Sequence, residues 1–143
     1  MSGDVPAGPI GVVADDLIWA SRLTAAVERA GARPVRLGSM RALDVALEAT
    51  TLAEEGDESV RLLGVVVDLN GRGYDGVDAV HAVAGARLPV IAVGQHEDLE
   101  LRKRALAAGA LRVFSYNKAF TDGAALVTSW LLRAAPRAAE PAR

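Results

Sequence analysis

The sequence predicts a single α/β domain in which helices cover both faces of a doubly wound, five-stranded parallel sheet. Short runs of valine, leucine and isoleucine alternate five times with longer helical segments, and the connections between them are short. A length of 143 residues suits one domain. Because 51% of the residues are hydrophobic but only 4% are aromatic, we expect a mainly aliphatic core between sheet and helices.

The first strand is predicted at residues 10–14, after a flexible lead over residues 1–9. A helix follows at once, because Asp15 or Asp16 can cap its first turn and apolar residues then recur at spacings of three and four. Gly31 is expected to end this helix. This segment therefore forms the first strand and helix of the domain.

The second strand is short and is predicted at residues 35–37. We expect it at an edge of the sheet, because the preceding Pro34 has no amide hydrogen for a central ladder. Ser39 can cap the second helix, over about residues 40–53.

The third strand, at residues 62–67, is a continuous apolar run that ends abruptly in Asp68. A loop rich in glycine, aspartate and asparagine then leads to a third helix at about residues 77–84. The fourth strand is expected at residues 89–93 and the fourth helix at about residues 98–108. Strand and helix thus keep alternating.

The fifth strand is predicted at residues 111–115, and the fifth helix at about residues 122–134. Residues 135–143, rich in alanine, proline and arginine, are expected to form a flexible tail. The domain proper therefore spans residues 10–134. The natural strand order for this alternation is the flavodoxin-like order 2-1-3-4-5.

That strand order brings three carboxylates to one edge of the sheet. Asp15 and Asp16 follow the first strand and Asp68 ends the third, which would be its parallel neighbour. Two carboxylates 5 Å apart repel by about 3 kcal/mol at an effective dielectric constant near 20. Since hard cations prefer oxygen ligands, the cluster favours a bound cation.

Composition excludes several classes of function. A net charge of −2, from 16 basic and 18 acidic residues, gives no basic footprint for nucleic acid. Without cysteine, the chain has no disulfide, thiolate nucleophile or cysteine metal site. The acidic start does not resemble a signal peptide, and no apolar run approaches the ~18 residues of a membrane span. We therefore expect a soluble, cytoplasmic protein without a membrane partner.

From about residue 10 to residue 132 the chain resembles the receiver domains of two-component response regulators. The resemblance rests on acidic residues after the first and third strands, on the residues that follow the third strand, and on a small-residue turn before the fifth. These are Asp15, Asp16, Asp68, Asn70, Asp75, Gly76, Ala108, Gly109 and Ala110. The combination is moderately specific for that family.

The resemblance implies a phosphorylation site. By analogy with the family, Asp68 would accept a phosphoryl group from a histidine kinase. Asp15, Asp16, Asp68 and the backbone carbonyl of Asn70 would hold Mg²⁺, which neutralises the carboxylates and the incoming phosphoryl oxygens. Structural roles compete with this interpretation, because one aspartate of the pair can simply cap a helix and Asp68 can accept hydrogen bonds from loop amides.

Two family positions differ in this chain. Gly94 stands where the family has a serine or threonine whose hydroxyl reaches the phosphoryl group. An ungapped count places Tyr116 at the family's lysine, whereas Lys118 matches only if the fifth strand holds two extra residues. Ala119 then replaces the family's cis proline, and a cis bond there would cost about 2.5 to 4 kcal/mol.

We therefore interpret the chain as an atypical or pseudo-receiver that is not an enzyme and works mainly by protein–protein interaction. Phosphorylation at Asp68 is expected to be weak or absent, and Mg²⁺ is the expected cofactor, bound weakly. The expected partner is a signalling protein, either a histidine kinase or an output domain, and a homodimer could form through the fourth helix, fifth strand and fifth helix.

Two alternatives remain open at this stage. One is a conventional Mg²⁺-dependent phosphoaccepting receiver in which Lys118 folds back to the acidic pocket. The other is a small flavodoxin-like enzyme or nucleotide-binding domain, although the loop after the first strand has no glycine-rich phosphate cradle.

Overall fold

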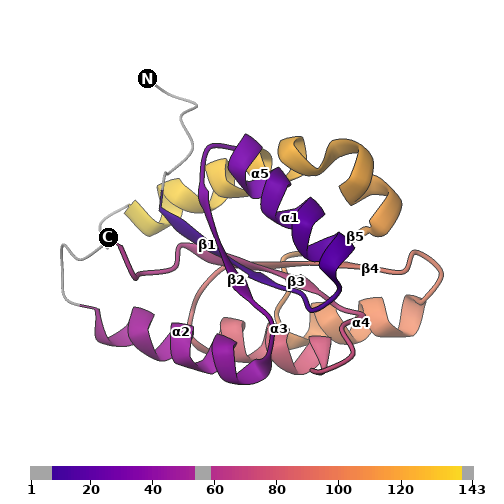
Figure 1. Ribbon diagram of the computed structural model, residues 1–143, viewed down its shortest axis with the longest axis horizontal. Helices are drawn as coiled ribbons and strands as arrows, with labels where there is room; N and C mark the ends of the chain where they lie inside the picture. The colour runs from indigo at the N-terminus through magenta and orange to yellow at the C-terminus, as the bar shows by residue number, and fades with distance from the viewer. Residues whose placement is uncertain (1–7, 54–58, 140–143) are drawn as a thin grey trace.

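The computed structural model describes residues 8–53 and 59–139 and has the predicted architecture (Figure 1). Five parallel strands form one sheet in the order β2-β1-β3-β4-β5, which confirms the predicted fold class and strand order. The strands are β1 (Pro9–Val13), β2 (Arg33–Leu37), β3 (Gly64–Asp68), β4 (Val90–Gly94) and β5 (Arg112–Ser115). The helices are α1 (Leu17–Arg29), α2 (Met40–Leu52), α3 (Gly76–Gly85), α4 (Leu99–Ala108) and α5 (Tyr116–Ala139).

The helices form two layers, with α1 and α5 on one face of the sheet and α2, α3 and α4 on the other (Figure 1). Successive residues of β3 point into opposite layers. Val65 and Val67 pack in the core beneath α2, α3 and α4, whereas Val66 packs beneath α1 and α5. Because both faces are covered, the central strands are continuous apolar runs rather than alternating ones.

Strand β2 lies at the edge of the sheet, as predicted, because it pairs only with β1 among the described residues. It begins at Arg33, two residues before the predicted start, so Pro34 lies inside the strand, opposite Ile10. A proline is tolerated there because an edge strand has one side without a ladder partner.

The start of α5 differs from the prediction. Residues 116–121 were expected to connect the fifth strand to a helix at about residue 122, but helix follows β5 directly. Ser115 explains this, because its hydroxyl accepts a hydrogen bond of 3.1 Å from the amide of Lys118, in the manner of a helix cap. Asp122, with φ −122° and ψ 22°, interrupts the helix and separates this first segment from the rest of α5.

The ends of the domain also differ slightly from expectation. The sheet begins at Pro9, within the predicted lead, and α5 continues to Ala139, within the predicted tail. Residues 1–7 and 140–143 of those two predicted segments lie outside the described residues. No helix in the described part of the chain is both long and apolar enough to cross a membrane.

Candidate functional site

The carboxyl ends of β1 and β3 place the predicted acidic residues at one edge of the sheet. The two strands are parallel neighbours, with Val13 opposite Val67, so the predicted pairing is confirmed. Asp68 is the last residue of β3 and is only 1% exposed. Asp15 and Asp16 lie in the loop after β1, close enough for both carboxylates to act electrostatically on Asp68.

The Asp68 carboxylate already has hydrogen-bond partners. Its Oδ1 atom accepts a hydrogen bond from the Tyr116 hydroxyl and another, of 3.1 Å, from the backbone amide of Asn70. Burial raises the pKa of Asp68, and the charges of Asp16 and Asp15 raise it further, while these two hydrogen bonds act in the opposite direction. The hydrogen bonds from Tyr116 and Asn70 therefore stabilise the ionised carboxylate, whereas burial and the neighbouring negative charges destabilise it.

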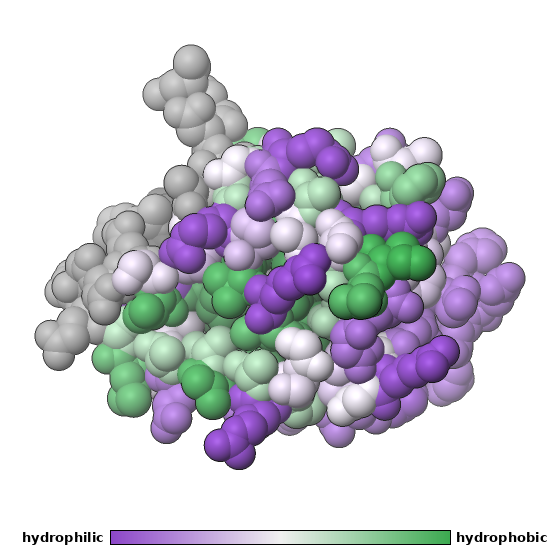
Figure 2. Space-filling view, in the orientation of Figure 1, coloured by the Kyte–Doolittle hydropathy of each residue, from purple (hydrophilic) through white to green (hydrophobic). Residues whose placement is uncertain are grey.

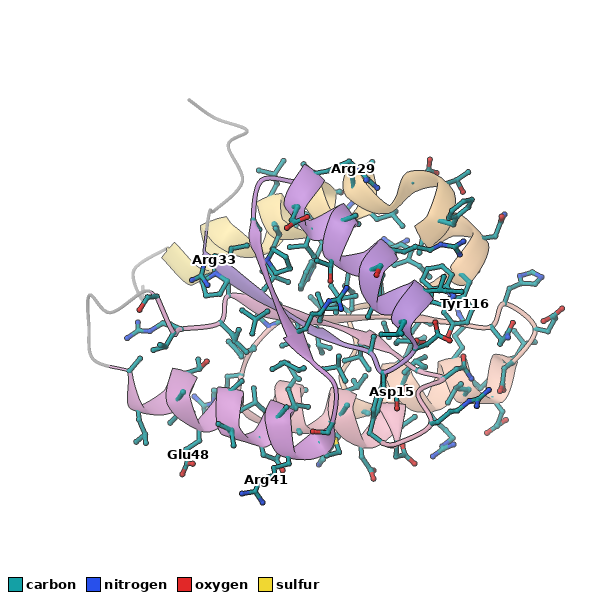
Figure 3. All side chains as sticks on the ribbon, in the orientation of Figure 1. Asp15, Arg29, Arg33, Arg41, Glu48 and Tyr116 are labelled. Carbon is teal, nitrogen blue, oxygen red and sulfur yellow. The ribbon has the colours of Figure 1, made fainter. Side chains whose placement is uncertain are left out.

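Tyr116 begins α5 and lies next to the N-terminal end of α1 (Figure 3). Its hydroxyl is also 3.1 Å from Oδ1 of Asn70, so it has two acceptors within reach. Burial and the hydrogen bond to Asp68 raise the pKa of the Tyr116 phenol well above its ordinary value. The phenol therefore stays neutral and acts as a donor to the buried carboxylate.

A second tyrosine supports the same edge of the sheet and was not singled out from the sequence. The hydroxyl of Tyr74 lies 3.1 Å from the carbonyl oxygen of Val13 and 2.7 Å from that of Asp68, so it bridges the ends of β1 and β3. Its ring packs against Gly71, where an added Cβ would lie 2.2 Å from the ring. In the sequence, Gly71 was the available sign of this packing, because a glycine in a loop can mark a place where another group approaches the backbone closely.

Replacing Tyr74 by phenylalanine should lower the free energy of unfolding by about 1 to 3 kcal/mol, because it leaves buried carbonyl groups without their donor. Urea denaturation followed by circular dichroism measures the change. Arg72→Ala is the matched control in the same loop, since the Arg72 side chain is exposed and only its backbone amide contacts Asp15. Equal stability of Tyr74→Phe and the natural sequence would contradict the bridging role.

The two aspartates after β1 bind backbone amides. Asp15 accepts hydrogen bonds from the amides of Arg72, at 3.1 Å, and Gly73, at 2.6 Å, and so ties the loop after β3 to the loop after β1. Asp16 caps α1 by accepting a hydrogen bond of 3.0 Å from the amide of Trp19. Of the two residues that the sequence offered as a cap, Asp16 takes that role.

These contacts decide how well the site fits Mg²⁺. Among residues 8–53 and 59–139, no group of three or more histidine, cysteine, aspartate and glutamate side chains is arranged to hold a metal ion. Asp15, Asp16 and Asp68 meet at one edge, but each carboxylate accepts hydrogen bonds from protein donors. The residues present therefore do not form a ready Mg²⁺ site with the Asn70 carbonyl, because hydrogen-bond donors already hold at least one oxygen of each carboxylate.

The structure does not bring Lys118 to Asp68. Its Nζ atom forms an ion pair of 2.9 Å with Asp122, and both side chains are about half exposed. Gly94 does lie at the site, at the end of β4. A Cβ there would be 3.2 Å from Cδ1 of Leu69 and 3.6 Å from Oδ1 of Asn70.

An open hollow of about 440 Å³ lies over the acidic edge. It is lined by Asp15, Asp16, Leu17, Ile18, Asn70 and Arg72. Leu17 and Ile18 are 77% and 61% exposed, and Figure 2 shows a hydrophobic patch where the first turn of α1 meets the surface. Asp68 is buried beside this hollow and does not line it.

No protein-family model matches the chain, and no curated protein matches it either. Solved structures do resemble it. A response regulator receiver protein from Burkholderia phymatum is 24% identical with a TM-score of 0.68, over 87% of this chain and 94% of that chain. The receiver domain of a modulated diguanylate cyclase from Desulfovibrio desulfuricans G20 is 19% identical with a TM-score of 0.69, over 92% and 99%.

A receiver domain protein from Clostridium thermocellum is 16% identical with a TM-score of 0.70, and the match covers 91% of this chain and 98% of that chain. The response regulator Rcp1, solved in a Mn²⁺-bound form, is 15% identical with a TM-score of 0.68, over 87% and 94%. The chain therefore has the fold of response-regulator receiver domains along most of its length.

Proposed function

We propose that the chain is an atypical receiver-like signalling module that acts mainly through protein–protein contacts, with phosphorylation of Asp68 weak or absent. The observation that carries the proposal is the hydrogen bond from the Tyr116 hydroxyl to Oδ1 of Asp68. By the ungapped count from Gly109, this neutral phenol stands at the position of the family's lysine. It occupies a lone pair of the carboxylate that would attack a phosphoryl group and supplies no positive charge.

The surroundings of Asp68 support the same conclusion. A phosphoryl group transferred to Asp68 would bring negative charge to an edge that already holds Asp15 and Asp16, so it needs cationic or hydrogen-bonding partners. Gly94 has no side chain to offer, and the amine of Lys118 is engaged by Asp122. We infer that Mg²⁺ binds weakly as well, since the carboxylates of Asp15, Asp16 and Asp68 each already accept a hydrogen bond from the protein.

We also propose that the partner is another signalling protein, either a histidine kinase or an output domain, and not a nucleic acid or a membrane. The exposed large apolar side chains of α4, of the residue before β5 and of the start of α5 support a protein contact. These are Leu99, Leu106, Leu111 and Phe120. A second copy of the chain could bind through α4, β5 and α5. We further propose that the protein acts in the cytoplasm and is not an enzyme.

The proposal is tested by incubating the protein with acetyl phosphate and Mg²⁺ and measuring the phosphorylated fraction by intact-protein mass spectrometry. We expect little or no phosphorylation, and no saturable binding of Mg²⁺ with beryllofluoride, a phosphoryl mimic, by tryptophan fluorescence. Asp68→Asn is the control that defines the background.

Efficient phosphorylation that is lost in Asp68→Asn would instead establish a conventional receiver. If it is lost in Lys118→Ala as well, the lysine must leave Asp122 and reach the acidic pocket. A flavin or nucleotide that remains bound after purification, seen in the absorption spectrum, would favour the third class, a small flavodoxin-like enzyme or nucleotide-binding domain.

A further inference from the structure

Helix α2 has a second apolar side, which faces away from the core. Leu43 and Leu47 are buried and hold the helix against the sheet, as in any amphipathic helix. Val45 and Leu52, however, are 58% and 72% exposed, and hydrophobic residues lie along the surface over α2 (Figure 2). Because these two residues are about two helical turns apart, they lie on one line along the helix. Neither the core nor the acidic edge accounts for this apolar line.

Two opposite charges lie beside Val45 on the same side of α2. Arg41 precedes Val45 by about one turn, and Glu48 follows it by about one turn. Both side chains are exposed and point away from the body of the protein (Figure 3). They are about 10 Å apart along the helix, too far to pair with each other. Within residues 8–53 and 59–139, neither forms an ion pair with another side chain.

This arrangement of charges is complementary to itself. When two copies of α2 lie antiparallel about a two-fold axis beside Val45, position 41 of each helix lies opposite position 48 of the other. Arg41 and Glu48 lie to the same side of Val45 around the helix, and the two-fold axis keeps that side facing the same way in both copies. Each Arg41 therefore meets the Glu48 of the second copy, and the two Val45 side chains meet at the axis.

Small residues beside Val45 let two such helices approach closely. Ala42 and Ala49 lie about one turn before and one turn after it, and both are partly buried. Leu52 lies about two turns beyond Val45, so it reaches the start of the second copy's α2, near Gly38. A Cβ on Gly38 would meet its nearest non-adjacent neighbour at 3.9 Å, so there is room for the leucine. The contact thus has an apolar centre flanked by charges, as protein–protein interfaces have.

The outer face of α2 consists of Arg41, Ala42, Val45, Glu48, Ala49 and Leu52. We propose that this face binds a second copy of the chain in an antiparallel, two-fold symmetric dimer. The dimer is weak and reversible, because a single pair of helices buries little area and exposed ion pairs contribute little each. Helix α3 lies between α2 and α4, so α4, β5 and α5 remain available to the signalling partner (Figure 1). The inference therefore goes beyond the proposed function.

The test exchanges the two charges. Analytical ultracentrifugation over a wide range of protein concentrations should show a monomer–dimer equilibrium for the natural sequence and gives its dissociation constant. Arg41→Glu should raise that constant about tenfold, because two attractions become two repulsions. Adding Glu48→Arg restores both ion pairs with their signs reversed and should return the constant to within about twofold of the natural value.

Two further variants test the apolar centre. Val45→Glu places two carboxylates at the axis and should abolish the dimer. Leu99→Glu is the matched control, because Leu99 is 65% exposed on α4, and it should leave the dissociation constant unchanged. Arg41→Glu puts an acidic residue in the first turn of α2, which favours the helix, so loss of the dimer does not reflect loss of α2. Circular dichroism verifies that every variant is folded.

Three results would overturn the inference. The first is a natural sequence that stays monomeric at every concentration, and the second is a dimer that Val45→Glu leaves intact. The third is a charge exchange that does not restore the dimer lost in Arg41→Glu. A dimer that Leu99→Glu breaks and Val45→Glu does not would place the contact on α4 instead. Failure of the proposed function gives a separate result, namely efficient phosphorylation of Asp68, which does not depend on the state of α2.

Discussion

Replacing Tyr116 by lysine and Gly94 by serine in one chain should raise the rate of Asp68 phosphorylation by acetyl phosphate about a hundredfold over the natural sequence. Lysine and tyrosine place their polar ends at similar distances from the backbone, so a lysine amine can take the position of the Tyr116 hydroxyl beside Asp68. It brings a positive charge where phosphoryl oxygens would arrive. A serine at Gly94 adds a hydroxyl donor on the neighbouring strand.

The magnitude follows from the interactions that the two substitutions add. A hydrogen bond to a charged group contributes about 1.5 to 3 kcal/mol, and each 1.4 kcal/mol corresponds to a factor of ten in rate. Serine is preferred to threonine because a Cβ at Gly94 already lies 3.2 Å from Cδ1 of Leu69. The flexible end of the leucine side chain can give way to this smaller group.

Intact-protein mass spectrometry over a time course measures the rate, and adding Asp68→Asn to the double variant should abolish the gain. Each single substitution should give part of the increase. Lys118→Ala should change nothing in either background, because its amine bonds to Asp122. If the double variant is phosphorylated no faster than the natural sequence, then the phenol at Tyr116 is not what limits the reaction.

Much of the fold could be predicted from short-range patterns. The run that ends in Asp68 is continuous because β3 is buried on both faces, so its length and composition identified a central strand. Pro34 correctly indicated an edge strand. The start of α5 was missed because the sequence pattern assigns Ser115 to the end of an apolar strand. Its hydroxyl can accept the capping hydrogen bond from the amide of Lys118 only because the backbone turns into a helix immediately after it.

The site was predictable only where a strand end determined a residue's position. Asp15, Asp16 and Asp68 follow from strand order, since the carboxyl ends of parallel neighbours share one edge. The hydrogen bond of Tyr116 to Asp68 joins residues 48 positions apart and depends on the direction of a side chain at the first turn of a helix. The ungapped count had placed Tyr116 at this position, but only the structure shows that its hydroxyl reaches the carboxylate.

The contacts of the acidic pair were less predictable still. Asp15 binds the amides of Arg72 and Gly73, 57 and 58 residues away, in a loop whose conformation no periodic pattern describes. The sequence shows how many carboxylates reach the edge but not which backbone amides they bind. The expectation of a bound cation rested on repulsion between carboxylates. The sequence does not show that the amides of Arg72, Gly73 and Trp19 donate hydrogen bonds to Asp15 and Asp16, which offset part of that repulsion.

Asp68→Asn should stabilise the folded chain at neutral pH by roughly 1 to 2 kcal/mol, because the amide keeps an acceptor for Tyr116 and the Asn70 amide without a buried charge. Burial raises the pKa of the folded Asp68 carboxyl above its ordinary value of 3.8, and Asp16 and Asp15 add to the effect. The folded state therefore binds this proton more tightly than the unfolded chain does.

The sign of the pH dependence follows directly. Below about pH 3.8 the carboxyl is protonated in both states, so the aspartate carries no penalty. As the pH rises from there to the folded pKa, the unfolded chain ionises first, and the contribution of Asp68 to stability falls. Above the folded pKa the full cost of burying the ionised carboxylate applies. The gain in free energy of unfolding from Asp68→Asn should therefore be largest near neutral pH and should vanish in acid.

Urea denaturation of both proteins between about pH 3 and pH 7 measures this difference as a function of pH. Asp75→Asn is the matched control, because Asp75 is an exposed cap of α3 and asparagine caps a helix about as well as aspartate. It should change stability little at any pH in this range. A destabilised Asp68→Asn protein at neutral pH would mean that the donors around Asp68 outweigh the cost of burying its charge, since the carboxylate would then be the better acceptor for Tyr116.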